Sequence, residues 1–150
     1  ISSWIMGMHM ESLGVRMERH CANALAVARW LDADSRISWV SYPGLEGDKY
    51  HALAEKYMPN GTCGVISFGV PGGREKVSAF LDHLKMVSIA THVADARSCT
   101  LYPAGTTHRQ LTDEQLEEAG VGIDLVRLSC GIENAADIIA DLDQALASIQ

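Results

Sequence analysis

An arginine in the middle of a short apolar segment is the residue of this chain best suited to bind a ligand. Arg127 stands in Asp124-Leu-Val-Arg-Leu-Ser129. In a strand its side chain would share a face with Leu125, opposite Val126 and Leu128. A guanidinium among apolar neighbours needs a partner, and its planar fork binds a carboxylate through two hydrogen bonds. The pattern therefore indicates a carboxylate ligand, an internal Asp or Glu partner, or a solvated sheet face.

A second candidate is the segment from Thr91 to Ser98, which has neither helical nor strand periodicity and carries His92, Asp95 and Arg97. Loops on a rigid scaffold often hold functional groups. A histidine with an aspartate three residues away could act as an acid/base pair. A capped turn with solvated charges is the alternative interpretation, and the sequence leaves both open.

Three further motifs have a structural interpretation beside the chemical one. His108, in the polar segment 102–109, could be a ligand or a base, although such a histidine more often caps a loop. Pro71-Gly-Gly-Arg74 could hold a phosphate at a helix N-terminus, but it matches no known glycine motif and a simple turn is favoured. His51 and Glu55 could begin a metal site, with a surface ion pair as the default.

The composition bounds the class of protein. The chain has 150 residues, 47% of them apolar and 21% charged, with a formal net charge of -7. That length fits one domain, and the apolar content argues against intrinsic disorder. The acidic balance argues against nucleic-acid binding. The apolar runs are only a handful of residues long, too short to span a membrane.

The cysteines indicate a reducing environment. Cys21, Cys63, Cys99 and Cys130 are widely spaced and form no CxxC pair, so neither a zinc site nor a redox motif is predicted. We expect reduced thiols packed as small apolar groups in a cytoplasmic protein. The N-terminus lacks the basic region of a signal peptide, and its apolar start at Ile1, without Met, indicates a piece of a longer protein.

A long helix is the first predicted element. Apolar residues recur at steps of three and four from residue 8 to residue 31. The stripe consists of Met10, Leu13, Met17, Cys21, Ala24, Ala28 and Leu31. Such a helix would be about 36 Å long, which is longer than a compact small domain needs. We therefore expect part of it to pack on something else.

The remaining elements predict an α/β or α+β fold. Strand candidates are residues 37–42, 64–70, 86–90, 98–102 and 124–129, and helix candidates are residues 47–57, a segment after 71–73, and segments that begin at Thr112 and Asn134. Thr112 and Gln115 form a capping box, and Asn134 is a typical N-cap. Several connections are too short for parallel crossovers. We expect a mixed or largely antiparallel sheet of four or five strands, covered by helices.

Six motifs occur in the order seen in one enzyme family. They are Arg16-Met-Glu-Arg-His-Cys-Ala-Asn-Ala-Leu25, Tyr42-Pro-Gly-Leu-Glu-Gly47, Gly64-Val-Ile-Ser-Phe-Gly69, Ala94-Asp-Ala-Arg-Ser98, Pro103-Ala-Gly-Thr-Thr-His108 and Val126-Arg-Leu-Ser-Cys-Gly-Ile-Glu133. On these motifs the chain resembles the C-terminal part of the pyridoxal-phosphate-dependent Cys/Met metabolism enzymes. The resemblance covers nearly the whole chain.

The resemblance implies a domain plan. Residues 1–33 would form a long interdomain helix, and residues 34–150 the small C-terminal α/β domain of a fold-type-I enzyme. The large domain that binds the cofactor, pyridoxal phosphate, would precede this chain. The lysine that binds the cofactor would lie there, because Lys49, Lys56, Lys76 and Lys85 match none of its context. This chain would then hold no catalytic, cofactor-binding or metal-binding residue.

The resemblance also assigns a substrate site. Arg127 matches the family arginine that binds the α-carboxylate of the amino-acid substrate. His92 falls in the loop that faces this carboxylate, where relatives carry Ser or Asn. Tyr102 stands where relatives often carry His. Arg127 and His92 are therefore the substrate-binding residues expected in this chain.

The implied activity is a γ-replacement that makes homocysteine from O-acetylhomoserine and sulfide or a thiol. The whole enzyme would be a homo-oligomer, and this chain alone would be inactive. Cystathionine γ-synthase and methionine γ-lyase are sister activities that the motifs leave open. Two other classes also stay open: a regulatory module that binds a small acid through Arg127, and a structural piece that associates through its first helix.

Overall fold

Two consecutive helices, and not one, form the N-terminal part of the computed structural model, which describes residues 1–149. Helix α1 covers Ser2–Glu11 and helix α2 covers Leu13–Ala33. The single helix predicted over residues 8–31 is therefore wrong in its continuity. Ser12 interrupts it, and the Arg16 guanidinium donates to the Ser12 hydroxyl and to the His9 carbonyl across the break. Ser and Gly14 both weaken a helix interior.

Within residues 1–149 the strands form one mixed sheet in the order β1-β2-β5-β4-β3. The strands are β1 Val40–Ser41, β2 Val65–Gly69, β3 Ser88–Ile89, β4 Cys99–Leu101 and β5 Leu125–Ser129. Only β3 and β4 are parallel, and the other neighbours are antiparallel. The predicted mixed sheet of four or five strands is confirmed.

Strands β2, β4 and β5 match the predicted ranges to within one residue at each end, whereas β1 and β3 are clearly shorter than predicted. The segment 37–42 contributes only β1, because Ile37 closes a turn by donating its N–H to the Asp34 carbonyl. The segment 86–90 contributes only β3. The N–H groups of Met86 and Val87 donate to the Asp141 carboxylate and not to a neighbouring strand.

The remaining helices follow their local sequence signals. They are α3 His51–Tyr57, α4 Gly73–Asp82, a short 3₁₀ helix η1 Pro103–Gly105, α5 Asp113–Glu118 and α6 Ala135–Ala147. The capping box of Thr112 and Gln115 at α5 is confirmed, and so is the Asn134 cap, whose side chain accepts from the Ala136 N–H. Helix α3 begins later than the predicted residue 47, because Asp48 holds a turn by accepting from the Tyr50 N–H.

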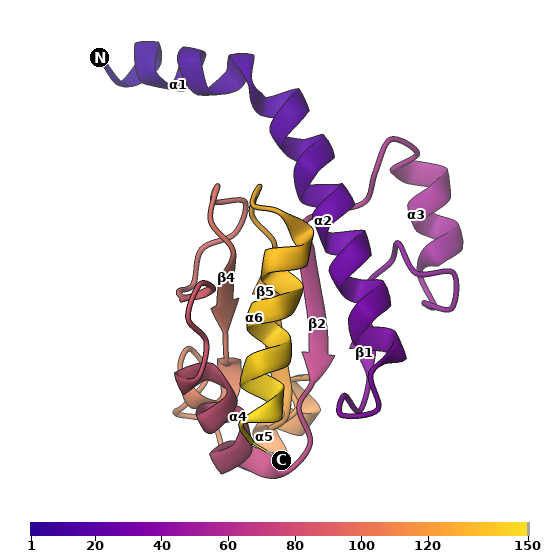
Figure 1. The fold of residues 1–150 in the computed structure, drawn as a ribbon, viewed down its shortest axis with the longest axis vertical. Coiled ribbons are helices and arrows are strands. Elements are labelled where there is room, and N and C mark those ends of the chain that lie inside the picture. Colours follow the sequence, from indigo (N-terminus) through magenta and orange to yellow (C-terminus); the bar gives the residue numbers. More distant parts are fainter. Residues whose placement is uncertain (150) are drawn as a thin grey trace.

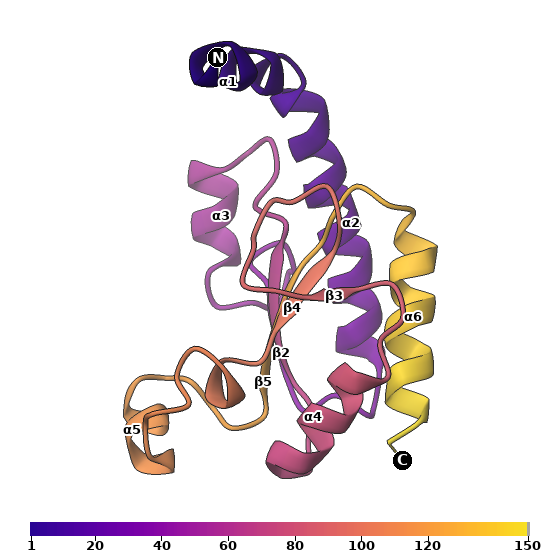
Figure 2. The same cartoon turned by 90° about the vertical axis from the view of Figure 1, so that its left-hand side faces the viewer.

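The two faces of the sheet have different neighbours. Helices α2 and α6 pack together on one face, whereas α3 and α5 lie on the other side (Figure 2). Ile66, Phe68, Val126 and Leu128 are completely buried and belong to one core cluster with residues of α2 and α6. Because side chains alternate along a strand, Arg127 points to the opposite face.

The N-terminal arm projects from this body (Figure 1). None of the residues of α1 is buried. Its large apolar side chains, together with those at the start of α2, are exposed to between 44% and 97%: Ile1, Trp4, Ile5, Met6, Met8, Met10, Leu13 and Val15. The first half of the predicted apolar stripe is therefore uncovered, and only Ala24, Ala28 and Leu31 are in the core. None of the described helices combines the length and the apolar character that a membrane crossing requires.

Candidate functional site

Arg127 occupies the middle of β5, the central strand of the sheet. Its backbone neighbours are Ser67 on β2 and Leu101 on β4. Strands on both sides hold the backbone in place, so the guanidinium extends from a rigid base. The side chain is half-buried, on the face away from α2 and α6.

The Arg127 guanidinium has one partner and unused donors. Its Nη2 donates to the Thr91 carbonyl at 3.0 Å. Its Nε is buried and has no hydrogen-bond partner within the described residues. No ion pair within residues 1–149 includes Arg127. The interpretation as an internal ion pair is therefore wrong for this part of the chain.

The loop that contacts Arg127 runs over residues 91–97 and is tied to the end of β5. The Ala94 N–H donates to the Ser129 hydroxyl at 3.1 Å, and the Ile132 N–H donates to the Ala96 carbonyl at 2.9 Å. Ala94 has φ 57°, an uncommon conformation for a residue with a side chain. Such a backbone persists only where neighbouring contacts hold it.

His92 lies on this loop and is exposed. Its Nδ1 is 3.6 Å from Asp95 Oδ2, and 63% of its side chain is exposed. The Arg97 N–H donates to Asp95 and lowers the pKa of that carboxyl, with a smaller contribution from His92. The contact between His92 and Asp95 therefore lies within the capped turn that was the alternative interpretation.

The simpler interpretation fits the remaining motifs. Arg74 donates to the Ala104 carbonyl and pairs with Asp113, so it ties helix α4 to η1 and to the first residue of α5. His51 lies 3.7 Å from Glu55 as a surface pair on α3. His108 contacts only its neighbour Thr107 among hydrogen-bonding side chains of residues 1–149. Across the described residues, no three His, Cys, Asp or Glu side chains come together as a metal site would require.

Tyr102 is a structural residue. It is 3% exposed, and its hydroxyl donates to the Ile123 carbonyl at 2.8 Å. Burial raises the pKa of this phenol. The side chain therefore joins the segment after β4 to the segment before β5 and does not face a ligand.

The four lysines do not fit a covalent cofactor site. All four are exposed. Lys49 and Lys56 lie over the rings of their neighbours Tyr50 and Tyr57. A lysine that binds a carbonyl cofactor needs an enclosed site that lowers its affinity for protons. None of the four lysines, all of which lie within the described residues, is enclosed in this way.

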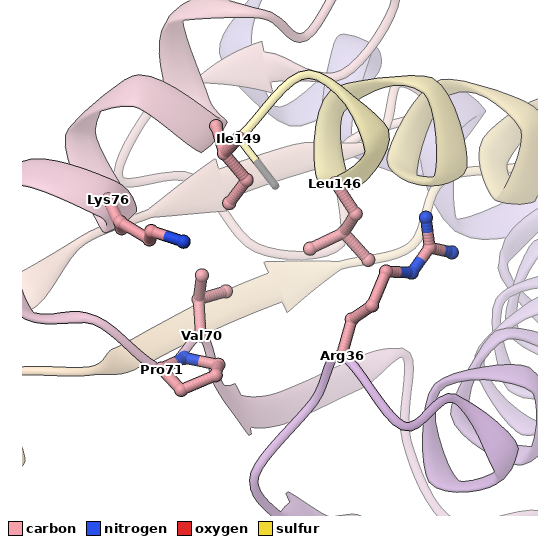
Figure 3. Close-up of a pocket in the computed structure, with 6 residues that line it drawn as sticks. All are labelled: Arg36, Val70, Pro71, Lys76, Leu146 and Ile149. Atoms are coloured by element: carbon pink, nitrogen blue, oxygen red, sulfur yellow. The ribbon is translucent and has the colours of Figure 1, made fainter.

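A small hollow beside the end of α6 does not include Arg127 among its lining residues. It has a volume of about 150 Å³ and is lined by Arg36, Val70, Pro71, Lys76, Leu146 and Ile149 (Figure 3). The guanidinium of Arg36 is already paired with Asp34 and Asp143. The hollow lies beside the last turn of α6 and offers no free guanidinium for an acid.

Ser98 and Glu133 were not found from the sequence as site residues. The Ser98 side chain is completely buried, and both its hydroxyl and its N–H donate to the Glu133 carboxylate. Ser98 is the last residue of the motif 94–98, and Glu133 is the last residue of the motif 126–133. Their contact spans 35 positions along the chain, so no local spacing could have indicated it.

Comparisons with known proteins place this geometry in a family. The profile described as Cys/Met metabolism PLP-dependent enzyme matches residues 1–147. A homocysteine synthase of Schizosaccharomyces pombe is 48% identical over 91% of this chain and 32% of its own length. An O-acetyl-L-homoserine sulfhydrylase of Leptospira meyeri is 44% identical over 99% of this chain and 34% of its own length.

A solved structure agrees in shape. It is that of a protein named as an O-acetylhomoserine (thiol)-lyase from Campylobacter jejuni, with N'-pyridoxyl-lysine-5'-monophosphate. The TM-score is 0.89 at 38% identity, over 96% of this chain and 34% of that one. This chain spans about a third of the length of the relatives it matches. It belongs to the family of pyridoxal-phosphate-dependent enzymes of cysteine and methionine metabolism.

Proposed function

We propose that this chain forms the substrate-carboxylate side of the active site in an enzyme that makes homocysteine from O-acetylhomoserine and sulfide or a thiol. The names of the relatives support this activity over the sister activities of the family. The substrate-binding residues in the proposal are Arg127 and, on the adjoining loop, His92. The chain supplies no catalytic lysine in this proposal.

The observation that carries the proposal is the unused donor capacity of Arg127. A buried donor without a partner destabilises a protein by about 1–3 kcal/mol, and a charged group by more. The Nε of Arg127 is in this situation, and its Nη2 is held at 3.0 Å by Thr91. A carboxylate ligand would satisfy the free donors and balance the charge. An amino-acid substrate carries such a group.

In the proposed reaction this chain binds and orients. Arg127 holds the α-carboxylate from a strand that cannot shift, and the Thr91 carbonyl sets the rotation of the guanidinium. Fixing the carboxylate limits the directions in which the Cα–H bond can point, and good orientation lowers the entropic part of a barrier. Pyridoxal phosphate, when bound by the large domain, supplies an electron sink for charge at Cα.

The proposal includes a domain plan. Residues 1–33 link a large cofactor-binding domain to a small domain of residues 34–150, with the last turns of α2 packed in the small domain's core. The length of the relatives supports a larger domain outside this chain. The uncovered apolar side chains of α1 support a further packing partner, from that domain or from another subunit of a homo-oligomer.

We also propose a cytoplasmic location. All four cysteines, which lie within the described residues, are free thiols. Burial raises the pKa of Cys130 to about 12 and also raises the pKa of Cys21. Unreactive, unpaired thiols are typical of proteins in reducing compartments.

The test uses the full-length protein that carries this chain, loaded with cofactor. Arg127→Ala is expected to lower kcat/KM for O-acetylhomoserine by about 100-fold, because truncating a buried charge contact costs about 2–5 kcal/mol. Arg127→Lys should recover part of the loss, since an ammonium lacks the planar fork. Cofactor absorbance should be unchanged in both variants.

The matched control is Arg29→Ala. Arg29 is exposed on α2 and makes no side-chain hydrogen bond within residues 1–149. Its replacement should leave kcat/KM within about twofold of the parent, as is usual for exposed sites. Equal kinetics for Arg127→Ala and the parent enzyme would refute the carboxylate role.

A further inference from the structure

We propose that Glu133 is a positioning residue for Arg127 and acts through the loop of residues 91–97. The proposal rests on the proposed function, because it concerns the same substrate carboxylate. Glu133 does not touch Arg127. It holds the segment whose Thr91 carbonyl accepts from Arg127 Nη2, and it thereby sets the direction of the free donors of the guanidinium.

The first step is the contact between Glu133 and Ser98. Oε1 of Glu133 accepts from the Ser98 N–H at 2.6 Å, and Oε2 accepts from the Ser98 hydroxyl at 3.0 Å. The same hydroxyl accepts from the Gly131 N–H at 2.9 Å. Ser98 is completely buried, and charge-assisted bonds of this kind are the stronger ones. The carboxylate thus joins the loop end to the turn after β5.

The loop and this turn are in direct contact. A Cβ added to Gly131 would lie 2.3 Å from Glu133 Oε2 and 2.5 Å from the Ala96 carbonyl oxygen. Only a glycine permits so close an approach. The Ile132 N–H also donates to Ala96. The position of the Glu133 carboxylate therefore determines where residues 96–98 can lie.

The loop is held on both sides of Thr91. On one side, the Ala90 N–H donates to the Thr100 carbonyl at 2.9 Å beside β3. On the other side, the Ala94 N–H donates to the Ser129 hydroxyl, with Ala94 at φ 57°. A left-handed conformation at a residue with a side chain is retained only while these contacts last. Without the Ser98 anchor the end of the loop would be free to move, and Ala94 and Thr91 would be held only by the Ser129 and Thr100 contacts.

Glu133 has its own support, which separates its role from that of the fold. The Asn23 side chain on α2 donates to the Glu133 and Gly131 carbonyls at 2.8 and 2.9 Å. Asn23 is 2% exposed. These bonds use the Glu133 backbone, so they survive when its side chain is changed. A side-chain variant should loosen the loop and leave the turn attached to α2.

The kinetic test uses the full-length holoenzyme. Glu133→Ala is expected to raise KM for O-acetylhomoserine about tenfold, as for other residues that support a binding group, with kcat within about twofold. Glu133→Gln should recover most of the affinity, because its amide oxygen still accepts from Ser98 N–H and its NH₂ can donate to the hydroxyl. Glu118→Ala, an exposed glutamate on α5, removes the same charge and should change neither constant.

Hydrogen exchange gives a readout that does not depend on turnover. In Glu133→Ala, peptides covering residues 91–98 should exchange faster, while peptides from β2 and β5 keep their protection. In Glu133→Gln and Glu118→Ala the exchange of residues 91–98 should match the parent. Should Glu133→Ala fail to fold, Ser98→Ala carries the same expectation, because it removes the hydroxyl shared by Glu133 and Gly131.

The two proposals fail in different ways. If Arg127→Ala raises KM but Glu133→Ala and Ser98→Ala leave KM and loop exchange unchanged, the positioning role is refuted and the carboxylate site stands. If Arg127→Ala leaves kcat/KM unchanged, the proposed function itself fails. A fall in kcat alone, with KM unaltered, in the folded Glu133→Ala variant would also overturn the positioning role.

Discussion

At the scale of single residues, two buried side-chain nitrogens of residues 1–149 lack a hydrogen-bond partner, and they mean different things. The Cys130 carbonyl can only accept, so the His20 Nδ1 that contacts it at 2.6 Å carries the hydrogen. That bond places a hydrogen on Nδ1 and leaves Nε2 as the atom without a partner. The partnerless Arg127 Nε is a donor of a permanent charge. Only the arginine therefore points to a ligand.

His20 is expected to contribute to stability and not to binding. Its side chain is 1% exposed and joins α2 to the turn after β5. His20→Leu leaves the Cys130 carbonyl without its donor and should destabilise the fold by about 1–3 kcal/mol. His20→Asn keeps a donor near the Nδ1 position and should lose less. Urea unfolding of the 150-residue chain measures both, and equal losses would contradict the assigned bond.

Arg127 could be found from the sequence, but its environment could not. Strand alternation is a local property, so the apolar neighbours Val126 and Leu128 were enough to predict its face. The internal partner of the guanidinium is the Thr91 carbonyl, which lies 36 positions away in the sequence and could not be predicted from local spacing. The same limit hid Glu133, since its contact with Ser98 follows no periodic spacing.

At the scale of elements, local signals predicted best where a helix begins. The caps at Thr112 and Asn134 involve side chains within three residues of the helix start, so sequence alone is enough. The break at Ser12 was missed, because the apolar stripe continues on both sides of it. The short β3 was missed because a distant carboxylate, Asp141, takes the N–H groups that a longer strand would have used.

Asp141 is expected to make stability depend on pH. It is 6% exposed and accepts from the N–H groups of Lys85, Met86 and Val87. Burial disfavours its charge, but these bonds and one from Gln144 outweigh burial and lower the pKa from its ordinary 3.8. The contribution is therefore present above about pH 4 and is lost as the pH falls through the lowered value.

The variant Asp141→Asn tests this directly. Asparagine has the shape of aspartate but only one acceptor oxygen, so the variant's free energy of unfolding should be about 2 kcal/mol lower than the parent's at pH 7. The difference from the parent should shrink at pH 3, where the parent carboxyl also begins to protonate. Asp82→Asn, at the exposed end of α4, should stay within about 0.5 kcal/mol at both pH values. Urea unfolding at the two pH values measures these free energies. A difference between parent and Asp141→Asn that is the same at both pH values would contradict the role of the Asp141 charge.

At the scale of the whole molecule, α1 is the feature that a single chain leaves unexplained. A helix with apolar side chains all round is normally buried, yet each residue of α1 is exposed. The sequence did indicate that part of the first helix packs on something else, because its length exceeded the need of a small domain. This expectation did not depend on the exact position of the break.

The 150-residue chain is expected not to bind pyridoxal phosphate at a defined site. Its lysines, Lys49, Lys56, Lys76 and Lys85, are exposed and none is enclosed. After incubation with the cofactor, borohydride reduction and peptide mass spectrometry should find sparse labelling spread over several amines. The full-length protein should label at one lysine outside this chain. Stoichiometric labelling of one of these four lysines would contradict the domain plan.

The central place of β5 has a consequence for how such an enzyme changes its preferences. A strand with hydrogen-bonded neighbours on both edges is among the last parts of a fold to open. The backbone position of Arg127 is therefore not expected to shift when an enzyme of this kind adapts to a longer or shorter amino-acid substrate. The acid end of every substrate would be anchored at the same point. Discrimination between substrates with different side chains would then depend on the residues that contact the substrate's other end. Those residues can be substituted without disturbing the sheet.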